Sequence, residues 1–306
     1  MTIFTVTDCT NDSQLQDFIN RATNGDTITF ACSGTITLTS TLTVKRKGQN
    51  GGNLTLDGNG QSVILDGGNS VRVLLVDGMH LILKGLTLSN GKTDDSGGGL
   101  FISRNGEATI DNSLFYGNTA RHGSGIFNNG GKMTMTNCTI AGNSASAWGG
   151  GLYNNFGGEA TISFCTIINN TATIAGGLTT GHPPIKISAT IVANNTAAKF
   201  SKRQNGSDQM TSLGFNIESG IDCNFSAQST DHQNTDPLFN PAGLQNNGGP
   251  TQTIALQSGS PAIGAVPIQM CPPIDQRGYL RPTGISSGDI GAYQSSYLAP
   301  PALTVP

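Results

Sequence analysis

Short runs in which apolar and polar residues alternate follow one another along most of the chain. Residues 27–30, 35–38 and 63–65 are early examples, and similar runs continue to about residue 198. Side chains of a β-strand point to opposite faces in turn, so each run predicts a short strand with one buried face and one solvent-facing face. The chain is therefore expected to be mostly β-structure.

Residues 13–24 carry the one clear helical pattern, with an apolar stripe along one face. Ser13 and Gln16 form a capping box at its start, and Gly25 follows its end. A short amphipathic helix in front of a run of strands is well placed to cover the open end of a solenoid. We therefore predict an N-terminal unit over residues 1–33, made of one strand and this cap helix.

A glycine-rich phrase recurs in four places, and its apolar anchors advance by 26 residues each time, through Leu100, Ile126, Leu152 and Leu178. Three short strands per turn of this length cannot pair as hairpins. Equivalent strands must instead stack in parallel, about 4.8 Å apart. The repeat predicts an all-β, right-handed parallel β-helix with three strands per coil over residues 34–198.

The repeat fades after about residue 198, and the rest of the chain is rich in Pro, Gly, Asn and Gln. Each phrase there stands only once, which is typical of irregular structure rather than of further coils. We predict a C-terminal region over residues 199–306 that packs on the solenoid and covers its last coil.

Two sets of residues recur at equivalent positions of the coils and predict buried stacks. Asn118, Asn143, Asn170 and Asn195 occupy one bend in four successive coils. They are expected to form an amide ladder that satisfies buried turn carbonyls. Cys138 and Cys165 also recur at one position, and we expect them to be stacked thiols rather than a disulfide.

Four further cysteines are candidates for disulfides. Cys9 and Cys32 flank the cap helix, while Cys223 and Cys271 lie in the C-terminal region. Each pair is predicted to form one bond. Two disulfides favour an oxidising compartment.

Charged residues make up 11% of the chain and the net charge is −3, without blocks of one sign. This balance gives no electrostatic reason to expect nucleic acid or an anionic membrane as a partner. No apolar run reaches the roughly 18 residues of a membrane span. The chain opens on a strand pattern rather than a signal peptide, which predicts either a cytosolic protein or an exported one whose leader is absent from this chain.

The coil sequences GGGLYNN and ATISFCTIINNTA resemble those of right-handed parallel β-helix repeat proteins of the pectate-lyase-like superfamily. The phrases NGGPT, GSPA, DQRG and DIGA are similar to the choice-of-anchor Q domain of secreted and surface proteins. Together the two resemblances cover nearly the whole chain. They imply export in a bacterium and attachment to the cell surface, and we expect a monomer.

Aromatic and charged residues, which are scarce in this chain, cluster beside the glycine phrases. Residues 26 positions apart are expected to be neighbours in successive coils, so these side chains form columns. Leu100 and Ile102 point inward, so Phe101 and its equivalents Phe127 and Tyr153 point outward. Two neighbouring columns are Ser96, His122, Trp148 and Ile174, then Asp95, Arg121, Ala147 and Thr173. Sugars present apolar C–H faces to aromatic rings and hydroxyls to charged groups, so this surface predicts polysaccharide binding.

We therefore predict that Phe101, Phe127, Trp148 and Tyr153 bind an acidic polysaccharide or cell-surface glycan. Lys132 is a further candidate contact with the glycan. Lys132 also lies between Glu107 and Glu159 on a second outward column. The alternating charges of this column are typical of cross-strand ion pairing.

Two reactions fit this surface. In a polysaccharide lyase, Arg121 or His122 would remove the proton α to a uronate carboxylate, and Asp94 with Asp95 would act as an acid or hold Ca²⁺. In a glycoside hydrolase, two carboxylates would flank the glycosidic bond. No other cofactor is expected.

Three other interpretations stay open. The alternative function is a non-catalytic cell-surface adhesin or structural spacer, in which the aromatic column only stabilises strand stacking. Ice binding needs rows of Thr-x-Thr pairs, and pairs such as Thr27 with Thr29 do not recur at the coil step. Asp275, Arg277 and Asp289 resemble an acid–base set, but an arginine beside carboxylates in a glycine-rich segment more often pins loops together.

Overall fold

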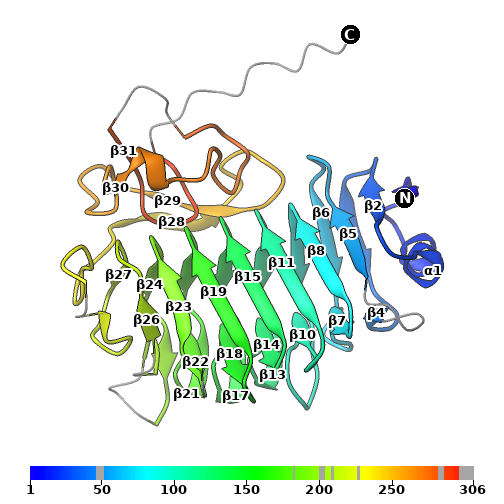
Figure 1. Cartoon of the computed structure of the whole chain (residues 1–306), viewed down its shortest axis with the longest axis horizontal. Coiled ribbons are helices and arrows are strands. Elements are labelled where there is room, and N and C mark those ends of the chain that lie inside the picture. Colours follow the sequence, from blue (N-terminus) through cyan, green and yellow to red (C-terminus); the bar gives the residue numbers. More distant parts are fainter. Residues whose placement is uncertain are drawn as a thin grey trace.

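The computed structural model describes residues 1–45, 52–181, 183–199, 204–207, 210–225, 228–281 and 286–295. In these residues the chain winds into a parallel β-solenoid whose coils stack along the long axis of the molecule (Figure 1). Three sheets run along the solenoid, and a fourth, shorter sheet accompanies four of the coils. The predicted parallel β-helix is confirmed.

The strands of each sheet follow one another in chain order. Sheet A consists of β1 (Ile3–Val6), β2 (Asp26–Phe30), β5 (Asn53–Asp57), β8 (His80–Lys84), β11 (Glu107–Asp111), β15 (Lys132–Thr136), β19 (Glu159–Ser163), β23 (Ile185–Ser188) and β26 (Met210–Ser212). Sheet B consists of β3 (Gly34–Thr37), β6 (Val63–Asp66), β9 (Leu86–Ser89), β12 (Leu114–Tyr116), β16 (Thr139–Ala141), β20 (Thr166–Ile168), β24 (Ile191–Ala193) and β27 (Ile217–Glu218). Sheet C consists of β4 (Leu42–Lys45), β7 (Leu74–Asp77), β10 (Leu100–Ile102), β14 (Ile126–Asn129), β18 (Leu152–Asn155) and β22 (Leu178–Thr180).

The structure adds a fourth short strand to four coils, between sheets B and C. Sheet D consists of β13 (Thr119–His122), β17 (Ser144–Trp148), β21 (Thr171–Ile174) and β25 (Thr196–Ala197). A complete coil therefore passes through sheets A, B, D and C before it returns to A. Parallel pairing also continues through β26 and β27, beyond residue 198, where the sequence repeat fades.

The core lies inside the coils and is built from stacked rows of apolar side chains. One row in sheet A is fully buried and in register from coil to coil, and it comprises Ile28, Leu56, Leu83, Ile110, Met135 and Ile162. Burial of each such side chain contributes about 1.5–3 kcal/mol. The alternating pattern of the sequence thus places one face of each strand inside the solenoid.

The predicted asparagine ladder is present and fully buried. The side-chain amide of Asn118 donates to Asn143 Oδ1, Asn143 to Asn170 Oδ1, and Asn170 to Asn195 Oδ1, each at 2.9 Å. The ladder extends one step further, from Asn195 to Asn205 Oδ1 at 3.1 Å. Each amide also donates to a backbone carbonyl of the preceding coil. The ladder therefore satisfies polar groups that water cannot reach.

A column of glycines lies directly against this ladder. A β-carbon on Gly125 would lie 2.5 Å from the Gly151 carbonyl oxygen and 3.1 Å from Asn143 Nδ2. A β-carbon on Gly99, Gly151 or Gly177 would likewise come too close to a backbone carbonyl oxygen and to an asparagine Nδ2 of the ladder. Only glycine lets successive coils approach this closely, which is a physical reason for the recurring glycine phrase.

The cap helix α1 (Ser13–Arg21) covers the N-terminal end of the solenoid, as predicted (Figure 1). Its Leu15 and Ile19 are buried. The predicted capping box is wrong, because the N-cap is Asp12 rather than Ser13. The Asp12 carboxylate instead accepts hydrogen bonds from Thr39, which ties the helix to the first coil. Among the described residues, no helix is long and apolar enough to span a membrane.

One of the two predicted disulfides is formed. Cys9 and Cys32 are bonded across the helix-bearing segment. The predicted bond between Cys223 and Cys271 is wrong: Cys223 packs in the solenoid core, whereas Cys271 packs against a separate apolar cluster of the C-terminal region. Cys138 and Cys165 are buried thiols, as expected from their equivalent positions.

The C-terminal region runs back over the solenoid instead of only covering its last coil (Figure 1). It contains two short antiparallel pairs: β28 (Phe239–Gln245) with β29 (Thr253–Leu256), and β30 (Val266–Pro267) with β31 (Ser287–Gly288). A 3-10 turn, η2 (Ile268–Met270), follows β30. Hydrogen bonds from this region reach coils far apart along the axis, from Ser62 to Ala189.

A buried polar cluster pins this region together. Arg277 forms a two-point contact with Asp275, at 2.8 and 2.6 Å, and both side chains are almost fully buried. Asp289 accepts hydrogen bonds from the backbone of Gly264 and Ser295. The loop-pinning interpretation of these residues is therefore the one that their contacts support.

We predict that Asn143→Leu lowers the free energy of unfolding by about 2–4 kcal/mol, because buried carbonyls and the neighbouring amides lose their partners. The measurement is chemical denaturation followed by circular dichroism. The control is Asn105→Leu, at an exposed asparagine outside the ladder. Equal stability of the two variants would contradict a structural role of the ladder.

Candidate functional site

The glycine phrases reverse the chain sharply between the end of sheet D and the start of sheet C. Gly123 has a φ of +52°, and Gly97, Gly149 and Ala175 also have positive φ at the equivalent positions. A β-carbon on Gly123 would lie 3.0 Å from Phe127 Cβ. Glycine suits this position because it adopts positive φ without strain and leaves room for the neighbouring ring. The reversal brings the last residue of each sheet D strand against the next strand of sheet C.

Phe101, Phe127 and Tyr153 form a continuous aromatic column on sheet C, at the paired positions that the coil step predicts. The ring centroids of each neighbouring pair are 5.4 Å apart. Such ring pairs contribute about 0.5–1.5 kcal/mol each beyond the area they bury. The column lies outside the core, as expected, but Phe127 is only 5% exposed. The prediction of a solvent-facing column is therefore wrong for Phe127, whereas Phe101 and Tyr153 are half-buried.

His122 and Trp148, the last residues of β13 and β17, cover this column. Ser96, His122 and Trp148 lie in register, which confirms the predicted order of that column. The His122 ring lies 5.9 Å from the Tyr153 ring, and the Trp148 ring stacks on Tyr153 at 6.4 Å. The column is half-buried because sheet D, which the sequence pattern did not reveal, folds over it.

A β-bulge displaces the neighbouring column. The register of β13 and β17 shifts, so that Ser146 and Ala147 of β17 together lie opposite Arg121 of β13. The extra residue makes the coil step irregular here, and the predicted one-to-one match of Arg121 with Ala147 is only partly right. Bulges of this kind bend a strand and change the direction of its side chains.

Asp94 and Asp95 are both exposed where the chain enters the region of sheet D. The backbone N–H of Arg121 donates to the Asp95 carbonyl oxygen at 2.7 Å, so these candidate residues are neighbours. Asp94 lines a shallow polar cavity of about 470 Å³ together with Arg72 and Lys92. In the described part of the chain, no group of three or more His, Cys, Asp and Glu side chains is placed to hold a metal ion. The calcium site at Asp94 and Asp95 stays a prediction.

Arg72 is the member of this surface that the sequence analysis missed. Its guanidinium lies over the Phe101 ring, 5.0 Å from the centroid. It donates to the carbonyl oxygens of Gly97 at 2.9 Å and Ser96 at 2.8 Å, which fixes its position. Arg72 therefore ends the aromatic column with a positive charge. The repeat is not explicit in its coil, so no column in the sequence included it.

His122 is placed in an unusual electrostatic setting. Burial lowers the pKa of His122, the Arg121 charge lowers it further, and the Asp95 carboxylate opposes both effects. The imidazole is therefore neutral at neutral pH and able to accept a proton. His122 Nδ1 is buried and has no hydrogen-bond partner among the described residues. A buried polar atom of this kind calls for a functional or structural explanation.

Lys132 lies on sheet A, away from the aromatic column. It is in register between Glu107 and Glu159, and its ammonium is 3.5 Å from the Glu107 carboxylate. Both side chains of this ion pair are largely exposed. The predicted glycan contact at Lys132 is not supported by this placement, because the cross-strand pairing accounts for the residue.

One solved structure with a similar fold is that of a pectate lyase, Pel9A. The two chains are 13% identical, and the match covers 97% of each with a TM-score of 0.52. At this level of identity the likeness concerns the fold alone. No family model and no curated protein sequence matches the chain. The similarity of the C-terminal phrases to a choice-of-anchor Q domain therefore stays a prediction.

We expect the pKa of His122, measured by NMR titration of its ring resonances, to lie below that of a free imidazole, about 6.5. Arg121→Gln should raise it because a nearby positive charge is removed. Asp95→Asn should lower it because the opposing carboxylate is lost. The two variants serve as controls for each other, and shifts in the same direction would contradict this electrostatic account.

Proposed function

We propose that this protein is an exported β-helix that binds an acidic polysaccharide along sheets C and D. The observation that carries the proposal is the aromatic column, which ends in the positive charge of Arg72 and is flanked by Arg121. The half-buried rings of Phe101, Trp148 and Tyr153 offer apolar faces to sugar C–H groups. Guanidinium groups bind carboxylates with two parallel hydrogen bonds.

The glycan would lie parallel to the solenoid axis, across successive coils. Trp148 and Tyr153 form one end of this path, and the polar cavity lined by Arg72, Lys92 and Asp94 lies beyond the other end of the column. Two of the three charged groups at that cavity are cationic. This local balance favours a uronate carboxylate over a neutral sugar there, although the whole chain is slightly acidic.

Cleavage by β-elimination is a second candidate function, favoured by the depressed pKa of His122. The neutral imidazole would take the proton α to a uronate carboxylate. The C–H electron pair would then form the new double bond as the bond to the glycosidic oxygen breaks, and that oxygen leaves with the adjoining sugar. Arg121 would stabilise the negative charge that develops on the carboxylate.

Export is part of the same proposal. The bond between Cys9 and Cys32 closes a loop in the N-terminal cap. Disulfides of this kind persist in oxidising compartments and are rare in the cytosol. An extracellular location would also expose the surface to polysaccharides.

The binding test is isothermal titration calorimetry with polygalacturonate, alginate and hyaluronan, and with neutral galactan for comparison. We expect at least one acidic glycan to bind, with an affinity that falls as salt screens the charges. Trp148→Ala and Arg72→Gln should each weaken binding about tenfold. Tyr116→Ala, at an exposed aromatic residue on sheet B, should not.

Binding of none of these acidic glycans, or equal losses in Tyr116→Ala, would contradict the binding proposal. Cleavage is followed by the ultraviolet absorbance of unsaturated uronates. His122→Gln should abolish it and keep the affinity for the glycan. If the wild type binds a glycan but does not cleave it, the protein is a binding module. If it neither binds nor cleaves any glycan, the result favours a structural spacer.

A further inference from the structure

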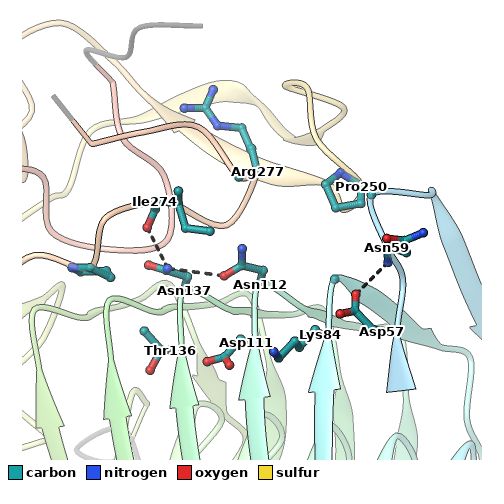
Figure 2. A pocket seen from close by; sticks show the side chains of 14 residues that line it. Asp57, Asn59, Lys84, Asp111, Asn112, Thr136, Asn137, Pro250, Ile274 and Arg277 are labelled. Atoms are coloured by element: carbon teal, nitrogen blue, oxygen red, sulfur yellow. Dashed lines mark hydrogen bonds between the residues drawn. The ribbon is translucent and has the colours of Figure 1, made fainter. Parts of the chain in front are cut away.

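A second cavity lies on the opposite part of the solenoid, beneath the C-terminal region (Figure 2). Its volume is about 440 Å³, within the roughly 300–1,000 Å³ of small-molecule sites. Its floor is the outer face of sheet A near the carboxyl ends of the strands. Its roof is formed by Pro250, Pro272 and Ile274 of the C-terminal region.

Charged side chains of three successive coils share this floor. Asp57, Lys84 and Asp111 lie in register at the last positions of β5, β8 and β11. Neighbouring members are therefore about 4.8 Å apart along the axis. Figure 2 shows them in one row, with Thr136 continuing it on the next strand. The row faces the cavity rather than the solenoid core.

Two of these groups have no hydrogen-bond partner in the structure as described. No hydrogen bond joins the Asp111 carboxylate or the Lys84 ammonium to another described residue. Asp57, in contrast, accepts a hydrogen bond from the Asn59 backbone N–H at 2.8 Å. Burial raises the pKa of Asp111, while the charge of Lys84 partly offsets this effect. The Asp111 side chain is half-buried and the Lys84 side chain is exposed, so a ligand in the cavity can reach both groups.

The roof of the cavity is held in place by the solenoid. The Asn137 amide donates to the Ile274 carbonyl oxygen at 2.9 Å, and Ser62 donates to the Pro250 carbonyl oxygen at 2.9 Å. Arg277 contributes to the lining, but its guanidinium is bonded to Asp275. The cavity is therefore preformed and apolar on one side, with an acceptor and a donor side by side on the other.

We propose that this cavity is a second carbohydrate site, which binds one ring of a neutral sugar. The Asp111 carboxylate would accept a hydrogen bond from one ring hydroxyl, and Lys84 would donate to a neighbouring one. The proline and isoleucine side chains would cover the C–H face of the ring. The net charge of the row is negative, with two carboxylates to one ammonium, which disfavours the acidic glycans assigned to sheets C and D.

The test is saturation-transfer NMR on the full chain with glucose, galactose, mannose, xylose, cellobiose and lactose as probes. We expect at least one of these neutral sugars to bind. Asp111→Ala and Lys84→Met should each weaken that binding about tenfold, because each removes a hydrogen bond between a charged group and a sugar hydroxyl. Glu107→Ala and Lys132→Met are matched controls on the same sheet, outside the cavity, and should leave the affinity unchanged.

The variant Trp148→Ala distinguishes this cavity from the glycan surface on sheets C and D. It should weaken binding of the acidic glycan but should not affect binding of the neutral sugar. Melting temperatures of all variants show whether they remain folded. The proposal is overturned if none of the six sugars binds, if the controls lose as much affinity as Asp111→Ala and Lys84→Met, or if Trp148→Ala abolishes binding.

Discussion

The in-register stacking of parallel coils is the constraint on which the other features of this protein depend. Each coil has buried backbone carbonyls at its turns, and the asparagine ladder from Asn118 to Asn205 satisfies them while it joins one coil to the next. The glycine column lets neighbouring backbones come close enough for these amides to meet. The regular spacing of side chains on the outer surface follows from this contact.

Both proposed sites use that spacing in different ways. On sheets C and D, the stacking repeats one kind of side chain, so that Phe101, Phe127 and Tyr153 form a column suited to an extended polymer. On sheet A, it places unlike groups in sequence, so that Lys84 lies between two carboxylates under a roof suited to a single ring. The same architecture therefore supports an elongated surface and an enclosed cavity.

The sequence was sufficient to predict the fold, the ladder and the order of the aromatic column, because each depends on residues that recur at nearly constant steps. It did not predict the covering of the column by sheet D, the bulge at Ser146 and Ala147, or the role of Arg72, which precedes the explicit repeat. The cavity beneath the C-terminal region was also missed, since it depends on contacts between residues far apart in the chain.

Disulfide cross-linking of paired positions tests the register of the coils most directly. Thr134 and Thr161 are paired on sheet A, which places their Cα atoms about 4.8 Å apart. Cysteines at both positions should form an intramolecular disulfide under mild oxidation, because this separation lies within the range of about 4.4–6.8 Å. Cysteines at Thr134 and Ser163 lie on a diagonal of roughly 7–8 Å and should not. Equal cross-linking of the two pairs, or none at Thr134 and Thr161, would contradict the account.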